Sequence, residues 1–166
     1  MATGALVSVE EYLASTWHPD RDYVDGELIE RNIGELSHGR LQTLIAAWLY
    51  GHETRWRIKA VTEVRLQINS SRFRIPDIMV LSGDAPHEEI VGTLPLLCIE
   101  ILSRRDTVDL IFDRIEDYFS MGVPFCWVIN PVRQRAWAAA PGRLTEAIDG
   151  ILRAGDIEMP LAEVIE

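Results

Sequence analysis

Two short apolar runs constrain this chain most, because each carries one carboxylate at a position where its pattern calls for a hydrophobic residue. Residues 73–81 (FRIPDIMVL) contain Asp77, and residues 94–103 (LPLLCIEILS) contain Glu100. Both runs are short, rich in Ile, Leu and Val, and bounded by polar residues, Pro or Gly. This pattern predicts two buried β-strands rather than helices.

An ionised carboxylate inside a buried strand costs free energy unless a partner compensates its charge, and a metal ion is one such partner. Side chains alternate along a strand, so Asp77 and Glu100 can point to the same face of a sheet and lie close together if the strands are neighbours. Two like charges held close raise each other's pKa unless a cation lies between them. The pattern predicts a metal site, but one structural alternative stays open, in which Asp77 ends a strand and Glu100 pairs with an arginine.

Several short motifs follow one another between Tyr23 and Pro131. They are residues 23–28 (YVDGEL), 37–38 (SH), 76–80 (PDIMV), 100–103 (EILS), 122–124 (GVP) and 127–131 (WVINP). In this order and spacing the chain resembles the PD-(D/E)XK nuclease superfamily and, within it, the Uma-type family of restriction-endonuclease-like proteins. A Pro-Asp pair alone carries no information, whereas the ordered set of motifs is specific.

The resemblance implies a fold and a reaction. The fold is a mixed α/β sheet flanked by helices, with a restriction-endonuclease-like αβββαβ core. The chain's length predicts a single domain over residues 1–166, and local patterns add an N-terminal helix and a β-hairpin. The reaction is metal-dependent hydrolysis of phosphodiester bonds in DNA. By this resemblance Asp77, Glu100 and the backbone carbonyl of Ile101 hold Mg²⁺ or Mn²⁺, cations that prefer oxygen ligands. Glu27 is a further acidic candidate for the catalytic site.

One position departs from the superfamily pattern. The catalytic lysine would stand two residues after Glu100, where this chain has Leu102. The Uma-type family looks as though it moves this lysine to the following helix, four residues before a tyrosine, and there the chain has Arg114 before Tyr118. An arginine keeps the positive charge but does not readily lose a proton. We therefore expect Arg114 to stabilise negative charge in the transition state and not to act as a general base.

Three residues are candidates for binding the substrate's phosphate backbone. His38 lies in the first turn of a helix predicted for residues 35–52, and the start of a helix attracts anions. Arg104 and Arg105 form a basic pair shortly after Glu100. The alternative interpretations are a solvated helix start for His38 and an ordinary charged loop for the two arginines.

Local patterns predict the elements around this site. Ser8 opens a short helix through a capping box, Asp25-Gly26 favours a hairpin turn, and apolar spacing predicts helices over residues 35–52 and 107–121. Residues 60–68 alternate and predict one strand with a solvated face. If that face is turned to the site, Glu63 projects near Asp77.

The charge balance weakens one part of the nuclease hypothesis. The chain has 16 Lys and Arg residues against 26 Asp and Glu residues, a net charge of −10. Phosphate contacts require clustered basic residues, so this balance lowers the expected non-specific affinity for nucleic acid. It does not exclude a metal-dependent nuclease with a local basic face.

Composition also bears on location and redox state. No apolar run approaches the roughly 18 residues that a membrane-spanning helix needs. The N-terminus shows no signal-peptide pattern, so we expect a cytoplasmic protein without membrane association. Cys98 and Cys126 lie in apolar strands outside any zinc-ligand spacing, which indicates buried free thiols.

These patterns leave three hypotheses for the function. The leading one is a Mg²⁺- or Mn²⁺-dependent endonuclease acting on DNA. The alternative is a catalytically inactive binding or assembly module with the nuclease fold, which Arg114 and the acidic net charge favour. The third is a metal-dependent hydrolase of a small phosphate ester. A homodimer is expected by analogy with restriction enzymes.

Overall fold

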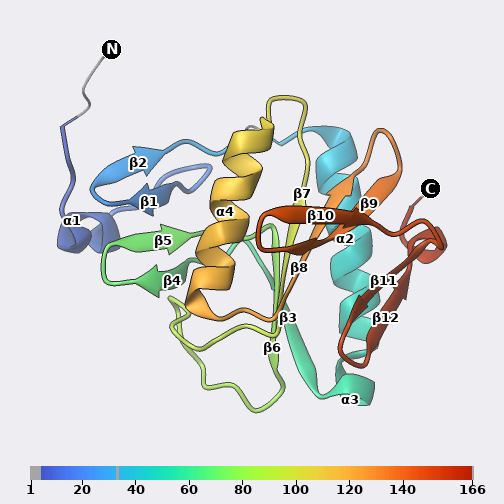
Figure 1. Ribbon diagram of the computed structural model, residues 1–166. Helices are drawn as coiled ribbons and strands as arrows, with labels where there is room; N and C mark the ends of the chain where they lie inside the picture. The colour runs from blue at the N-terminus through green and yellow to red at the C-terminus, as the bar shows by residue number, and fades with distance from the viewer. Residues whose placement is uncertain (1–4, 33, 166) are drawn as a thin grey trace.

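In the part of the chain that the structure describes, residues 5–32 and 34–165, a six-stranded mixed sheet forms the middle of the molecule (Figure 1). The structure is a computed structural model. The strands follow in the order β10-β9-β8-β7-β6-β3 and span Arg143–Glu146, Arg135–Ala140, Phe125–Asn130, Leu97–Ile101, Ile78–Ser82 and Ile58–Thr62. Strands β7 and β8 pair in parallel, and the other neighbours pair antiparallel.

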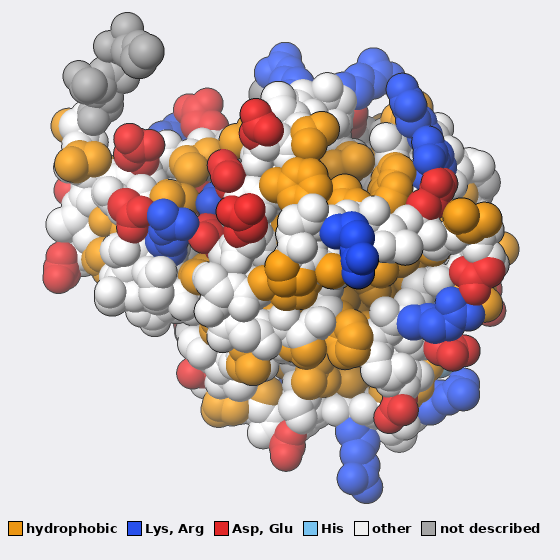
Figure 2. Space-filling view, viewed as in Figure 1, with side chains coloured by type: hydrophobic (Ala, Val, Ile, Leu, Met, Phe, Trp, Pro, Cys, Tyr) orange, Lys and Arg blue, Asp and Glu red, His pale blue; other side chains and the backbone are white. Residues whose placement is uncertain are grey.

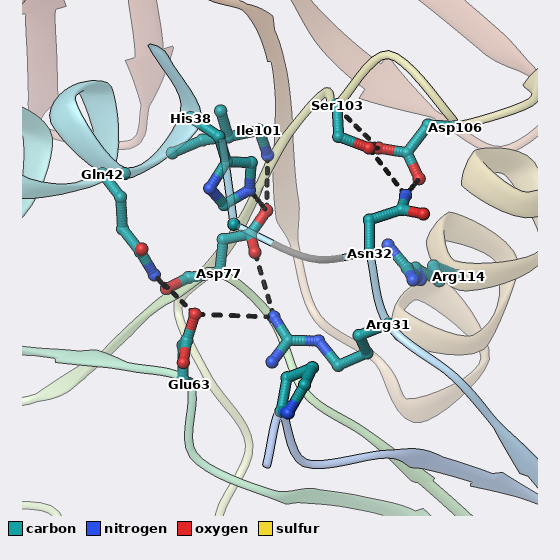
Figure 3. Close-up of a pocket in the computed structure, with 13 residues that line it drawn as sticks. Arg31, Asn32, His38, Gln42, Glu63, Asp77, Ile101, Ser103, Asp106 and Arg114 are labelled. Carbon is teal, nitrogen blue, oxygen red and sulfur yellow. Dashed lines mark hydrogen bonds and ion pairs between the residues drawn. The ribbon is translucent and has the colours of Figure 1, made fainter. Parts of the chain in front are cut away.

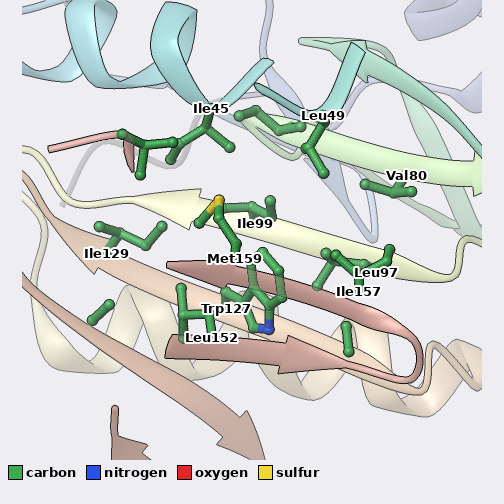
Figure 4. Close-up of a cluster of buried hydrophobic side chains, with 14 of the residues drawn as sticks. Ile45, Leu49, Val80, Leu97, Ile99, Trp127, Ile129, Leu152, Ile157 and Met159 are labelled. Atoms are coloured by element: carbon green, nitrogen blue, oxygen red, sulfur yellow. The ribbon is translucent and has the colours of Figure 1, made fainter. Parts of the chain in front are cut away.

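Helices α2 (Leu36–Gly51) and α4 (Val108–Met121) cover opposite faces of this sheet. Successive strand residues point to opposite faces, so each strand contributes to two cores. The core under α2 contains Ile45 and Leu49 against Ile99, and Figure 4 shows how these side chains meet. The core under α4 is built from alternate strand residues and the helix's own apolar stripe, which are Met79, Leu81, Cys98, Cys126, Val128, Ile111, Ile115 and Tyr118.

The predicted αβββαβ core is confirmed, because α2, β3, β6, β7, α4 and β8 occur in this order, with α3 before β3 and the second-sheet strands β4 and β5 inserted between β3 and β6. Helix α4 carries the chain back across the sheet between β7 and β8, which is why these two strands run parallel. The carboxyl ends of β7 and β8 and the N-terminal ends of α2 and α4 therefore lie at one edge of the sheet, at the top of Figure 1.

A second, smaller antiparallel sheet lies beside α4, in the strand order β2-β1-β5-β4. Its strands span Glu27–Ile29, Asp22–Val24, Arg72–Arg74 and Leu66–Asn69, and the short helix α1 spans Val9–Ala14. Tyr12 of α1 packs on Tyr23 and Phe73, and the ring centroids of Tyr12 and Tyr23 are 4.9 Å apart. This aromatic cluster joins the helix to the sheet.

Several predicted turns and helix ends are confirmed. The Asp25-Gly26 turn has the positive φ angles, 50° and 96°, that an Asp-Gly hairpin supplies. Ser8 caps α1 by accepting the Glu11 N–H at 3.1 Å, and Gly122 ends α4 in the left-handed region with φ of 104°.

The single strand predicted for residues 60–68 is wrong. Glu63 has φ of 54°, in the left-handed region, and the chain passes there from β3 in the central sheet to β4 in the second sheet. A partly buried ion pair accounts for the departure, because Arg65, only 9% exposed, donates to Asp20 at 2.7 Å instead of facing solvent. The apolar run at residues 73–81 is also divided between the two sheets, into β5 and β6. The break lies around Pro76, which has no N–H group to donate to a neighbouring strand.

Small elements complete the fold. Helix α3 (Glu53–Trp56) follows α2, and the hairpin of β11 (Ile151–Ala154) and β12 (Ile157–Pro160) closes the core under α2 before a 3₁₀ turn at Leu161–Glu163. Among the described residues, no helix is both long and apolar enough to cross a membrane.

Candidate active site

A pocket of about 270 Å³ opens at the sheet edge where β6 begins and β7 ends (Figure 3). Its walls come from the segment after β2, the first turns of α2, the turn after β3, the loop after β7, and α4. The side chains labelled there are Arg31, Asn32, His38, Gln42, Glu63, Asp77, Ile101, Ser103, Asp106 and Arg114. The fold thus brings segments that are distant in sequence to one polar cavity.

Donors from three different segments hold the Asp77 carboxylate. Its Oδ2 accepts the backbone N–H of Ile101 at 2.7 Å and lies 3.3 Å from Nε2 of His38. Its Oδ1 accepts from Nη2 of Arg31 at 3.0 Å. The Asp77 side chain is 6% exposed, so these donors replace the water that would otherwise solvate its charge.

The Glu100 carboxylate is buried and reaches from β7 to α4. Its Oε2 accepts from Nη1 of Arg114 at 3.1 Å, and its Oε1 accepts from the hydroxyl of Tyr118. Arg114 and Tyr118 are four residues apart on one face of α4, which lets both contact the same carboxylate. Burial raises the pKa of Glu100 to about 7; Arg114 opposes this increase, and the charge of Asp77 adds to it.

Asp77 directly precedes β6, and Glu100 lies on the neighbouring strand β7. Strands β6 and β7 pair antiparallel with Ile78 opposite Ile99, and continuing this register by one residue places Asp77 next to Glu100. The rise in the Glu100 pKa that Asp77 causes reflects this proximity. The structure therefore brings the two sequence-predicted carboxylates together at one site.

Asp22 is a further buried carboxylate, next to Arg114, and no sequence pattern pointed to it. Its Oδ2 accepts from Nη1 of Arg74 at 3.1 Å and lies 3.5 Å from Nε of Arg114, while its Oδ1 accepts the N–H of Ile75. Burial alone would lower the pKa of Arg114, but the charges of Glu100 and Asp22 raise it above its ordinary value. Arg114 therefore stays protonated between two carboxylates.

The sequence matches one protein family over most of its length. Residues 9–155 fit the model of the Uma2 family, which is described as "Putative restriction endonuclease". The chain belongs to the Uma2 family. This agrees with the resemblance expected from the ordered motifs.

The fold of this Uma2 chain is also found in a solved structure. A crystal structure from Anabaena variabilis, described as "a putative nuclease belonging to DUF820", superimposes with a TM-score of 0.81 at 18% sequence identity. The match covers 95% of this chain and 97% of that chain. At this identity the similarity shows the nuclease-like fold alone. The comparison with curated proteins gave no match.

Glu27, the further acidic candidate in this Uma2 chain, does not reach the pocket. It is exposed at the start of β2 and is not among the described residues that line the cavity. The reason is topological, because β2 is an outer strand of the second sheet and Glu27 directly follows the Asp25-Gly26 turn. This position gives no support to a catalytic role.

The predicted substrate-binding residues have different surroundings. His38 lies in the pocket against Asp77, and although burial lowers its pKa, the hydrogen bond to Asp77 and the charge of that carboxylate raise it above the ordinary value. Arg104 and Arg105 are exposed on the loop after β7, just outside the pocket. Arg104 lies 3.9 Å from a carboxylate oxygen of Glu35.

Arg31 and Gln42 contact Asp77 but were not identified from sequence. Arg31 is 9% exposed and lies 4.0 Å from Glu63 as well as next to Asp77. Gln42 donates to the backbone oxygen of Asp77 at 2.9 Å and to Glu63 at 3.4 Å. Glu63 therefore reaches the pocket as expected, but from a turn rather than from a strand face.

A network of hydrogen bonds holds the segment after β2 against the loop between β7 and α4. Asn32 donates to Oγ of Ser103 at 2.6 Å and to Asp106 at 2.9 Å. The N–H and the hydroxyl of Ser103 also donate to Asp106, at 2.8 and 3.0 Å. These bonds tie the segment that carries Arg31 to the loop between β7 and α4, and so fix Arg31 beside the carboxylates.

The donor set fits a hard divalent cation. Asp77 and Ile101 line the pocket, and Glu100 lies next to Asp77 without being a lining residue, so the two carboxylates would supply the charged oxygen ligands. Burial raises the pKa of Glu100 to about 7, and a cation bound beside it would favour the charged form. Among the described residues, no group of three or more His, Cys, Asp or Glu side chains is arranged to hold an ion. Mg²⁺ commonly binds proteins through one or two carboxylates and keeps several water ligands.

Proposed function

We propose that this Uma2 protein is a Mg²⁺- or Mn²⁺-dependent endonuclease that hydrolyses phosphodiester bonds of DNA. The observation that supports the proposal is a pair of adjacent buried carboxylates. Asp77 lines the pocket, and Glu100 is paired with Arg114, which also lines it. Arg31 and His38 line the pocket as well and contact Asp77. Carboxylates suit a divalent cation, and the surrounding cationic side chains suit a phosphate group.

Six residues in or next to the pocket have a role in this proposal. Asp77, Glu100 and the backbone carbonyl of Ile101 hold the cation, which supplies charge neutralisation and an acidified water molecule when bound. Arg114 remains protonated and stabilises negative charge on the phosphate, but it does not accept a proton. His38 and Arg31 offer hydrogen-bond donors to the non-bridging phosphate oxygens.

One observation favours the alternative function, a non-catalytic binding or assembly module. The chain's own groups already compensate both carboxylates, since Arg31 and His38 contact Asp77 and Arg114 contacts Glu100. The sequence left open the alternative in which Asp77 ends a strand and Glu100 pairs with an arginine. The pairing of Glu100 with Arg114 is present, although Asp77 precedes β6 rather than ending a strand. A protein of this kind would keep its fold and bind no catalytic metal.

Cleavage of supercoiled plasmid DNA tests the proposal. The parent protein is incubated at low salt with Mg²⁺, with Mn²⁺ or with EDTA, and the fraction of nicked and linear DNA is measured over time. We expect nicking with either metal and none with EDTA. Asp77→Asn and Glu100→Gln should each reduce the rate at least 100-fold, because each removes one of the two charged ligands of the cation.

Glu27→Gln is the matched control, since Glu27 is an exposed carboxylate away from the pocket. It should cleave at the rate of the parent. A well-folded parent that leaves the plasmid intact at high protein concentration would instead support the non-catalytic module. Cleavage that survives both Asp77→Asn and Glu100→Gln would also overturn the proposal.

A further inference from the structure

Charge is unevenly distributed over this acidic molecule. Figure 2 shows Lys and Arg side chains along the upper edge of this face, near the ends of β7 and β8, and Asp and Glu side chains over the β1–β2 hairpin and α4. The exposed acidic side chains of these two elements include Asp25, Glu27, Asp109, Asp113 and Glu116. A polyanion approaching the pocket is therefore repelled on one side and attracted on the other.

The topology explains why basic residues collect at the upper edge. Because β7 and β8 run parallel, the loop that carries Arg105 and the turn that carries Arg133 leave the sheet at the same edge. Both arginines are exposed, and among the described residues no carboxylate pairs with either of them. The turn is ordered by Asn130, whose Oδ1 accepts the N–H groups of Val132 and Arg133 at 3.0 and 2.9 Å.

A surface path connects the active-site pocket to this turn. The first turn of α2 separates the pocket from a second hollow of about 140 Å³. His38 and Gly39 line the pocket, whereas Ser37 lines the second hollow together with Gln134, the residue after Arg133. A chain of phosphates that crosses the first turn of α2 therefore passes from the pocket to the β8–β9 turn.

We infer that DNA bound in the pocket extends across the first turn of α2, and that Arg105 and Arg133 contact phosphates beyond the scissile one. This inference rests on the proposed function and adds the course of the bound DNA. From the pocket the DNA leads away from the β1–β2 hairpin and towards the β8–β9 turn. It identifies the substrate as a polynucleotide, because a small phosphate ester that fills the pocket does not reach Arg133.

Binding measurements with charge-removing variants test the inference. The probe is a fluorescein-labelled DNA duplex of about 30 base pairs, and Kd is measured by anisotropy from 50 to 300 mM salt. The buffer contains EDTA in one series and Ca²⁺ in another, so that binding is measured without relying on cleavage. The variants are Arg105→Gln and Arg133→Gln.

Each variant should weaken binding by up to about tenfold at 0.1 M salt and lower the slope of log K against log salt by about 0.9, the loss of one phosphate contact. The matched control is Arg143→Gln. Arg143 is also exposed, but it begins β10, opposite Ala140 at the far end of β9. That end is roughly 17 Å from the β8–β9 turn at about 3.4 Å per residue. This control should bind like the parent.

The outcomes separate this inference from the proposed function. Unchanged Kd and salt slope in Arg105→Gln and Arg133→Gln, or an equal loss in Arg143→Gln, would overturn the inference even if the parent cleaves plasmid. The absence of duplex binding by the parent would overturn it as well. Binding that depends on Arg105 and Arg133 without any cleavage would support the inference and overturn the proposed function.

Discussion

Arg114 is the residue on which the charge balance of the site depends. It lies between Glu100 and Asp22, contacts both carboxylates and is 11% exposed. Its position, four residues before Tyr118, was predicted from the sequence, but its second carboxylate partner was not. The guanidinium group can serve two carboxylates at once because its donors point in different directions.

Replacing Arg114 by Met should destabilise the metal-free protein. At pH 8 the change leaves the buried Glu100 without its cation, and loss of one member of a buried ion pair costs roughly 3 kcal/mol. Arg114→Lys should lose less of the free energy of unfolding, since lysine keeps the positive charge. It should still lose some, because the lysine does not contact both carboxylates. Urea denaturation in EDTA measures the free energy of unfolding. A Met variant within about 1 kcal/mol of the parent would contradict the assigned role.

The pKa of Glu100 predicts how stability depends on pH in the absence of metal. It rises from an ordinary 4.5 to about 7 in the folded protein, chiefly because the side chain is buried. Between these values the folded state keeps a proton that the unfolded state has released, so the free energy of unfolding falls as pH rises.

We therefore expect the melting temperature of the parent in EDTA to decrease between about pH 5 and pH 8. Glu100→Gln should show a flatter profile over the same range, because the glutamine has no proton to lose. Differential scanning calorimetry measures both profiles. Two parallel profiles would show that Glu100 does not titrate in this range.

At the scale of secondary-structure elements, α4 joins the two sheets. Asp117 on α4 accepts from Arg72 at 2.7 Å and from Arg74 at 2.7 Å, both on β5 of the second sheet. Arg74 in turn contacts Asp22, which lies 3.5 Å from Arg114. A continuous series of ion pairs therefore leads from the second sheet to the active-site carboxylates.

Asp117→Asn should loosen the second sheet from α4. The change weakens two charge-assisted hydrogen bonds at a site where Asp117 is buried, and we expect a loss of roughly 2–4 kcal/mol in the free energy of unfolding. Hydrogen exchange should accelerate most in β4 and β5. Asp113→Asn, exposed on the same helix, is the control and should stay within about 0.5 kcal/mol of the parent. An acceleration of hydrogen exchange that is equal throughout the chain would argue against a specific link between α4 and the second sheet.

Local patterns were sufficient to predict most elements. The Asp25-Gly26 turn, the Ser8 cap and the two long helices depend on interactions within a few residues, so they could be read from sequence. The strand at residues 60–68 was mispredicted because Arg65 pairs with Asp20, a partner far away in the chain. Alternation of residue types alone does not reveal such a pairing.

The candidate site was only partly predictable for the same reason. Asp77 and Glu100 stood out because a carboxylate in an apolar run is unusual, and Arg114 followed from the family resemblance. Asp22 and Arg31 lie in polar surroundings in sequence, and only the folded chain buries them against distant partners. Long-range contacts, which no local pattern encodes, complete the site.

At the scale of the whole molecule, the acidic net charge and a nucleic-acid substrate are compatible. Acidic side chains lie over the β1–β2 hairpin and α4, whereas exposed arginines lie near the ends of β7 and β8, outside the pocket. The unequal distribution of charge, rather than its total, governs where a polyanion approaches.

The homodimer expected by analogy with restriction enzymes stays a prediction. Two linked sites would allow both strands of a duplex to be cut in one encounter. Sedimentation velocity at micromolar concentration should show a species of twice the monomer mass. A single species with the monomer mass across the concentration range would contradict the prediction and favour nicking of one strand at a time.

The measurement that tests the central claim most directly is calorimetric titration of the metal-free protein with Mn²⁺. The account predicts one Mn²⁺ per chain for the parent and for Glu27→Gln. It predicts at least tenfold weaker binding for Asp77→Asn and for Glu100→Gln, and little further loss in the double variant because both carboxylates hold the same ion. A parent that binds no Mn²⁺, or single variants that bind it as tightly as the parent, would contradict the claim that Asp77 and Glu100 form one cation site.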